Sequence, residues 1–244
     1  MPAHVYFIVS AVFHYLGPAF AVLLFARVEV LGVAWLRIAG AALIFALWRR
    51  PCRALERLDR SGKRLLLAWG AVLAVMNSCF YVAIDRLPLG TVAAIEFLPV
   101  VALAAVGART RRNAVALILA VPGVYLLTGV RLEGEPLGVT FAFANALLFA
   151  LYIVLAHRVA RRNDLRGIDG LAASMLIAAV VVTPIGGWEA LPALTDPLAL
   201  LAGVGVGVSS SVIPYVSDQL AMRRLARATY ALMVSLLPAT ATVI

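Results

Sequence analysis

The feature that most constrains this chain is a succession of apolar runs, each long enough to cross a lipid bilayer. A helix rises about 1.5 Å per residue, so about 20 apolar residues span the roughly 30 Å hydrocarbon layer. Of the 244 residues, 64% are hydrophobic and 14% are charged, whereas about 25% of the residues in a soluble domain are charged. We therefore predict a polytopic membrane protein and exclude a soluble fold.

The apolar runs predict nine transmembrane helices joined by mostly short linkers. An open sheet is excluded in lipid, because each unpaired backbone group there costs several kcal/mol. Short linkers make sequence neighbours antiparallel, so the expected fold class is all-α, a polytopic transmembrane helical bundle. The expected spans are 4–26, 30–48, 65–84, 87–108, 114–130, 137–157, 170–188, 198–217 and 228–244.

Basic residues fall mostly on one side of these spans. Of the 21 Lys and Arg residues, 17 lie in linkers on the side of the N-terminus, three lie on the opposite side and Arg37 lies inside a span. The asymmetry predicts that the N-terminus and the arginine-rich linkers are cytoplasmic. A net charge of +9 could otherwise suggest nucleic-acid binding. Because membrane topology accounts for the basic residues, we expect no nucleic-acid partner. The arginine-rich linkers are 49–64, 109–113, 158–169 and 218–227.

An internal repeat adds to this topology. Segments 84–91 and 222–229 share an arginine, a leucine and a threonine at an offset of 138 positions, and a proline, Pro99 or Pro238, follows each segment. By the span order, the first segment lies on the outer side and the second on the inner side. Five helices per repeat is an odd number, so the second copy is expected to be inverted, as is common in secondary transporters.

The repeat divides the chain into two unequal parts. Residues 1–130 form a complete five-helix repeat, and residues 131–244 form a second repeat with four helices. The counterpart of span 114–130 would fall beyond Ile244, so the expected architecture is two inverted five-helix repeats with the last (tenth) helix missing. The alternative is a natural nine-helix protein.

Prolines and glycines interrupt several spans. A proline removes a backbone hydrogen bond and kinks its helix, which favours a central cavity. Gly203, Gly205 and Gly207 remove side-chain bulk from the eighth span and predict close helix packing. The prolines within spans are Pro18, Pro99, Pro122, Pro184, Pro214 and Pro238.

Short motifs lie in the second, fourth and ninth spans: Trp35-Leu36-Arg37, Leu87-Pro88-Leu89-Gly90-Thr91 before Ala94-Ile95-Glu96-Phe97, and Leu232-Met233-Val234-Ser235-Leu236-Leu237-Pro238. With these motifs the chain resembles the drug/metabolite transporter superfamily, and within it the EamA-type exporters related to threonine/homoserine efflux proteins. The resemblance implies ten helices in two inverted repeats, and proton-driven export of amino acids or other small metabolites across the bacterial cytoplasmic membrane. The family often has a glutamate where this chain has Leu237, so Glu96 is expected to act alone.

Two charged residues inside spans are the first candidates for a transport site. Ionisable groups within a membrane are rare and costly, so they are usually functional. Glu96 is the one acid expected in the middle of a span; it could carry a proton or bind a substrate ammonium, or it could be a structural partner of Arg37 or a polar neighbour. Arg37 could bind a substrate carboxylate in a fork, pair with Glu96, or extend to the outer interface.

Three neutral side chains are further candidates for substrate or proton binding. His14 lies next to the Gly17-Pro18 break in the first span and is either a proton relay or a packing residue. Asn77 in the third span and Asn145 in the sixth either line a cavity or form hydrogen bonds between helices.

The expected function is secondary active transport by alternating access, with a small-molecule substrate, protons and the lipid bilayer as partners. A membrane-embedded enzyme or a non-transporting membrane subunit is the alternative. The sequence contains no HExxH, GxGD or P-loop pattern, so we predict no enzyme, no catalytic residue, no metal ligand and no cofactor. Cys52 and Cys79 suggest no disulfide framework. A homodimer is left open.

Overall fold

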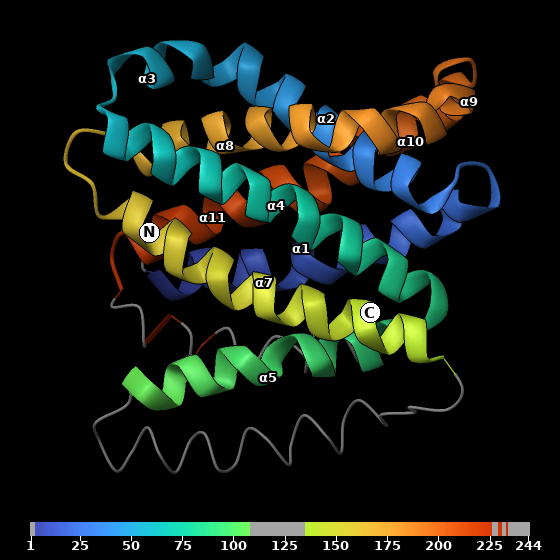
Figure 1. Ribbon diagram of the computed structural model, residues 1–244, viewed down its shortest axis with the longest axis horizontal. Helices are drawn as coiled ribbons and strands as arrows, with labels where there is room; N and C mark the ends of the chain where they lie inside the picture. Colours follow the sequence, from blue (N-terminus) through green and yellow to red (C-terminus); the bar gives the residue numbers. More distant parts are fainter. Residues whose placement is uncertain (1–2, 108–134, 226–228, 231–232, 234–244) are drawn as a thin grey trace.

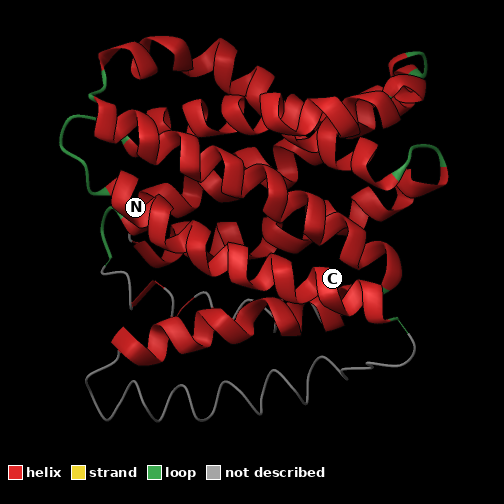
Figure 2. Ribbon diagram, in the orientation of Figure 1, coloured by secondary structure: helices red, strands yellow, loops and turns green. Residues whose placement is uncertain are grey.

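The computed structural model describes residues 3–107, 135–225, 229, 230 and 233, and within these residues every regular element is helical (Figure 2). The predicted all-α class is therefore confirmed for this part of the chain. The expected span 114–130 and most of span 228–244 lie outside the described residues. The two inverted repeats, 1–130 and 131–244, and the missing tenth helix stay predictions.

Helices follow one another with short connections, as the sequence predicts. Several are bounded by residues that favour a helix start, because Pro51, Pro136 and Pro197 each occupy the first helical position, where no amide hydrogen is needed. The elements are α1 (Ala3–Val22), η1 (Leu23–Ala26), α2 (Val30–Arg49), α3 (Pro51–Arg57), α4 (Arg60–Arg86), α5 (Leu89–Gly107), α7 (Pro136–Ala160), α8 (Gly167–Val182), η2 (Thr183–Gly187), α9 (Leu191–Leu194), α10 (Pro197–Gly207), η3 (Val208–Val212) and α11 (Ile213–Met222).

Six helical segments of the described chain are long and apolar enough to cross a membrane. A shorter apolar segment, Leu89–Pro99 of α5, belongs to a further predicted span. Large side chains such as Leu47 (79% exposed) and Trp188 (76% exposed) face outward, as contact with lipid requires. The six segments coincide with predicted spans and are Val5–Ala26, Val30–Arg49, Arg60–Arg86, Pro136–Ala160, Gly167–Gly187 and Pro197–Met222.

The connections divide between the two ends of the bundle. In Figure 1, α3, the α7–α8 connection and the C-terminal end of α11 lie at the left end, whereas the η1–α2 turn, α9 and the α4–α5 turn lie at the right end. The described parts of the arginine-rich linkers thus share one end, which we call the arginine-rich end. Its cytoplasmic orientation stays a prediction.

Two predicted boundaries need correction. The third span was expected to begin at residue 65, but its helix α4 begins at Arg60, because the Asp59 carboxylate caps it by accepting a hydrogen bond from Gly62 N at 2.7 Å. The eighth span was expected to end at residue 217, but its helix continues to Met222. Asp218 is therefore a helical, buried residue and not a linker residue. It lies near the end of its helix and not in the middle of a span, where Glu96 was expected as the one acid.

Two glycines of α10, Gly203 and Gly207, allow it to pack closely against α2, as the sequence predicts. A Cβ atom on Gly207 would lie 2.8 Å from Arg37 O and 3.1 Å from Ala41 N, both backbone atoms of α2. A Cβ atom on Gly203 would lie 3.0 Å from the Leu36 side chain, whereas one on Gly205 would meet nothing within 4 Å. The close-packing prediction is therefore wrong for Gly205, which faces outward.

Replacing Gly207 with Ala is expected to destabilise the protein by about 1–3 kcal/mol, the usual cost of overpacking. The added methyl group would press against the backbone of α2, which cannot rotate away. The measurement is thermal unfolding in detergent, with Gly205→Ala as the matched control on the same helix. Equal melting temperatures for the two variants would contradict this close contact.

Candidate functional site

The five polar residues singled out in the sequence line one small cavity in the middle of the bundle. Each comes from a different helix, and all five are buried. The cavity has a volume of about 10 Å³, which is room for about one water molecule. Its other lining residues are Pro18, Met76, Phe80, Phe149 and Tyr215. The predicted site residues are His14 (α1), Arg37 (α2), Asn77 (α4), Glu96 (α5) and Asn145 (α7).

Glu96 is held by neutral partners. One carboxyl oxygen, Oε1, accepts a hydrogen bond from Asn145 Nδ2 at 2.9 Å, and Oε2 accepts a longer one from Tyr15 Oη at 3.4 Å. The side chain is 3% exposed. The Glu96–Arg37 pair weighed from the sequence is not among the ion pairs of the described residues, so Glu96 can accept a proton or a cationic group without first losing an ion pair.

Arg37 donates hydrogen bonds to oxygen atoms of η3 and α11. Its Nε donates to Ser211 Oγ at 2.9 Å, and its Nη2 donates to Ser210 O at 2.8 Å and to Tyr215 Oη at 3.3 Å. Tyr81 and Tyr215 also place their rings 5.6 and 5.9 Å from the guanidinium carbon, within the range of cation–π attraction. At 4% exposed, Arg37 points inward, so extension to the outer interface is wrong.

Pro214 explains why a backbone carbonyl group in the middle of the η3–α11 helix is available to Arg37. Pro214 has no amide hydrogen, so Ser210 O, four residues earlier, has no intrahelical donor from that position. The chain forms a π-helical segment here, Val208–Val212, a distortion that is frequent at functional sites. The sequence Ser209-Ser210-Ser211 thus offers both a free carbonyl and a hydroxyl to Arg37.

Polar atoms without a protein partner remain around the cavity. Within the described part of the chain, His14 Nδ1 and Asn145 Oδ1 are buried and have no hydrogen-bond partner. The His14 ring packs against Tyr15 and Phe149, with ring centroids 5.4 and 5.6 Å apart. Unpaired buried polar atoms are costly, so this cavity suits a polar occupant better than an empty state.

Asn77 contributes less distinctly to the site. Its Nδ2 donates to Leu73 O at 2.7 Å, one turn back on the same helix. Tyr215 on α11 is a further hydrogen-bond partner of Asn77, so the hydrogen bond between helices considered from the sequence is also present. The amide still lines the cavity and can change partner when a ligand enters.

Sequence reasoning missed several groups that complete the site. Tyr15 and Tyr215 were not singled out, because a tyrosine in an apolar span is usually a packing residue. The Ser210–Ser211 pair could have been found from three successive serines ahead of a proline. Among the described residues, no group of three or more His, Cys, Asp or Glu side chains could hold a metal ion.

The arrangement matches a small molecule that carries both charges. A guanidinium from α2 and a carboxyl from α5 face the same cavity, so one could bind a carboxylate and the other an ammonium group. The unpaired Asn145 oxygen could accept a hydrogen bond from an ammonium or hydroxyl group. Because the cavity holds about one water molecule, such a ligand would enter only after the surrounding helices separate.

Comparison with known proteins identifies relatives along nearly the whole chain, although no protein-family model matches it. The chain is 31% identical over 230 residues to the threonine/homoserine exporter RhtA of Salmonella typhimurium and, equally, to that of Escherichia coli K12. Each alignment covers 93% of this chain and 76% of the relative. These relatives are exporters and not enzymes, in agreement with the predicted transporter and against a membrane-embedded enzyme. The chain is a multi-pass membrane transporter and belongs to the family of threonine/homoserine exporters, within the EamA-type drug/metabolite transporters.

Proposed function

We propose that this protein exports small amino acids in exchange for protons, with Arg37 and Glu96 as the two charged groups of its substrate site. The observation that carries this proposal is the position of both side chains on one buried cavity without an ion pair between them. Arg37 would bind the substrate carboxylate, and Glu96 the ammonium group. The names of the relatives supply the substrate class, threonine and homoserine.

Proton coupling follows from competition for one carboxyl group. When Glu96 carries a proton, it cannot form a strong ion pair with a substrate ammonium; when it loses the proton, it can. Its neighbours Tyr15 and Asn145 are neutral and remain compatible with either state. A substrate leaving on the outside would therefore be replaced by a proton, which returns inward down its gradient.

Alternating access would open the closed cavity to one side at a time. The π-helical segment η3 touches α1 closely, since a Cβ atom on Gly17 would overlap the Ser210 side chain. Gly17 precedes Pro18, which also lines the cavity and removes one backbone hydrogen bond from the continuous helix α1. Both helices therefore lack regular α-helical hydrogen bonding where they meet. We place the hinge of the opening motion at this crossing.

The test is transport in proteoliposomes that contain the purified protein. Radiolabelled threonine, homoserine and a panel of other amino acids are supplied with and without a pH gradient. Threonine or homoserine should move faster than in protein-free liposomes, and the gradient should increase the accumulated amount. If no amino acid moved, the proposed function would be wrong.

The orientation also belongs to this proposal, and the two cysteines provide a probe for it. Cys52 in α3 is exposed at the arginine-rich end, whereas Cys79 is buried. With a cytoplasmic arginine-rich end, a membrane-impermeant maleimide is expected to label Cys52 only after cells are permeabilised. In a Cys52→Ser background, Thr195→Cys at the opposite end should be labelled in intact cells. The reverse pattern would overturn the orientation.

A further inference from the structure

Asp218 is a second buried acid, and the site described above does not use it. It lies in α11 and is 4% exposed. Its Oδ1 accepts a hydrogen bond from Ser10 Oγ of α1 at 2.5 Å, and the Tyr230 hydroxyl is a further hydrogen-bond partner. Within the described part of the chain, no Arg, Lys or His forms an ion pair with it. A buried carboxylate without a cationic partner is costly.

The partners of Asp218 suit a group that changes its protonation state. A hydroxyl group can donate to a carboxylate or accept from a protonated carboxyl, so Ser10 and Tyr230 can serve both forms. The titratable groups on which the Asp218 charge acts are Tyr152 from α7, Tyr215 one turn earlier on α11, and Tyr230. A purely structural carboxylate would be better held by an arginine or by backbone amides, which favour its charged form alone.

Asp218 also lies between the Glu96 cavity and the arginine-rich end. On α1, Ser10 precedes Tyr15, the Glu96 partner, by five residues, or about 7.5 Å of helix rise. On α11, Asp218 follows Tyr215, a cavity residue, by three residues, or about 4.5 Å. Both steps lead toward the end of the bundle that holds the N-terminus and α3 (Figure 1).

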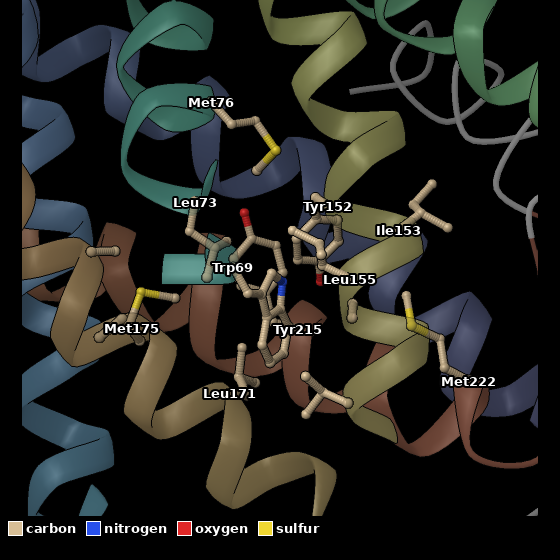
Figure 3. Packing of buried hydrophobic residues seen from close by; sticks show 14 of the residues in the cluster. Trp69, Leu73, Met76, Tyr152, Ile153, Leu155, Leu171, Met175, Tyr215 and Met222 are labelled. Atoms are coloured by element: carbon tan, nitrogen blue, oxygen red, sulfur yellow. The ribbon is translucent and has the colours of Figure 1, made fainter. Parts of the chain in front are cut away.

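Aromatic hydroxyl groups occupy the interval between the two acids. The rings of Tyr152 and Tyr215 are 5.4 Å apart, and Figure 3 shows them side by side next to Trp69. Among the described residues, Tyr152 Oη and Trp69 Nε1 are buried without a hydrogen-bond partner. A tyrosine hydroxyl both donates and accepts hydrogen bonds, so Tyr152 and Tyr215 can pass protons when water enters between them, whereas the Trp69 indole N–H only donates.

We infer that Asp218 is the inner proton acceptor of the exporter, through which a proton taken up by Glu96 from the outside leaves toward the arginine-rich end. The Glu96 carboxyl loses the proton, the hydroxyl groups of Tyr215 and Tyr152 relay it, the Asp218 carboxylate gains it, and water at the arginine-rich end removes it. This inference rests on the proton-coupled export proposed above.

The test separates substrate movement from proton coupling in proteoliposomes. Exchange of labelled for unlabelled threonine at equal pH needs no net proton movement, whereas accumulation driven by a pH gradient does. Asp218→Asn is expected to lower gradient-driven accumulation about tenfold or more, with exchange retained. The matched control is Asp85→Asn, the same change at an exposed carboxyl at the end of α4, which should leave both measurements unchanged.

The outcomes distinguish this inference from the proposed function. If the wild-type protein shows no gradient-driven transport, proton coupling itself is wrong, and the inference falls with it. If the wild type is driven by the gradient and Asp218→Asn is driven equally well, only the inference is wrong. Should Asp218→Asn fail to fold, Ser10→Ala keeps the acid and removes its hydroxyl donor; an unchanged pH profile of driven transport in that variant would overturn the inference.

Discussion

Replacing Glu96 with Gln is expected to reduce gradient-driven threonine transport in proteoliposomes about a hundredfold, the usual scale for loss of a positioned proton-transfer group. Gln has nearly the same shape as Glu, and its oxygen can still accept the hydrogen bond from Asn145 Nδ2. It cannot bind a proton at neutral pH or form an ion pair with an ammonium group. Initial rates of labelled threonine uptake, with and without a pH gradient, measure the effect.

The matched control for this change is Glu135→Gln. The side chain of Glu135 is 47% exposed, and its Oε2 lies 3.8 Å from Arg86 Nη1, so the same chemical change there should leave transport unaffected. The Glu96→Gln protein should unfold at the same temperature as the wild type or a higher one, since it carries a neutral group in place of a buried acid. Full gradient-driven transport by Glu96→Gln would show that another group carries the proton.

The fold class and the residues around the cavity could be predicted because lipid imposes a simple rule. A polar side chain within an apolar run avoids lipid, so Glu96 and Asn145 were expected to face the bundle interior. For Arg37, extension to the outer interface was an open alternative. The structure brings these side chains to one cavity. Their roles in transport stay predictions that the proposed experiments test.

The partners of Arg37 could not be predicted, because they depend on a distant helix. The sequence shows that Pro214 frees a carbonyl group, but it does not show that α2 crosses α10 and η3 closely enough for Arg37 to reach Ser210. That crossing depends on Gly207, whose contact is made only in the tertiary structure.

Asp218 was missed for a related reason. Ser217, Asp218 and Gln219 form a polar stretch at which hydropathy alone ends the eighth span, so that Asp218 and Gln219 were assigned to the linker 218–227. The structure buries all three within α11, because Ser10 on α1 and neighbouring tyrosines supply polar partners there. Hydropathy measures the preference of isolated side chains, whereas burial here is decided by hydrogen bonds between helices.

Replacing Arg37 with Lys is expected to raise the KM for threonine about tenfold to a hundredfold, with a smaller change in kcat, because a forked charged contact contributes about 1–3 kcal/mol. Lys keeps the charge but has a single ammonium group, which cannot hold Ser210 O and Ser211 Oγ and also grip a carboxylate with two parallel hydrogen bonds. Uptake rates over a range of threonine concentrations measure KM and kcat separately. The control is Arg27→Lys, at an exposed arginine whose Nη1 lies 3.1 Å from Asp196 Oδ2, for which an unchanged KM is expected. A lower melting temperature for Arg37→Lys with an unchanged KM would mean that Arg37 only joins α2 to η3, and that the substrate carboxylate binds elsewhere.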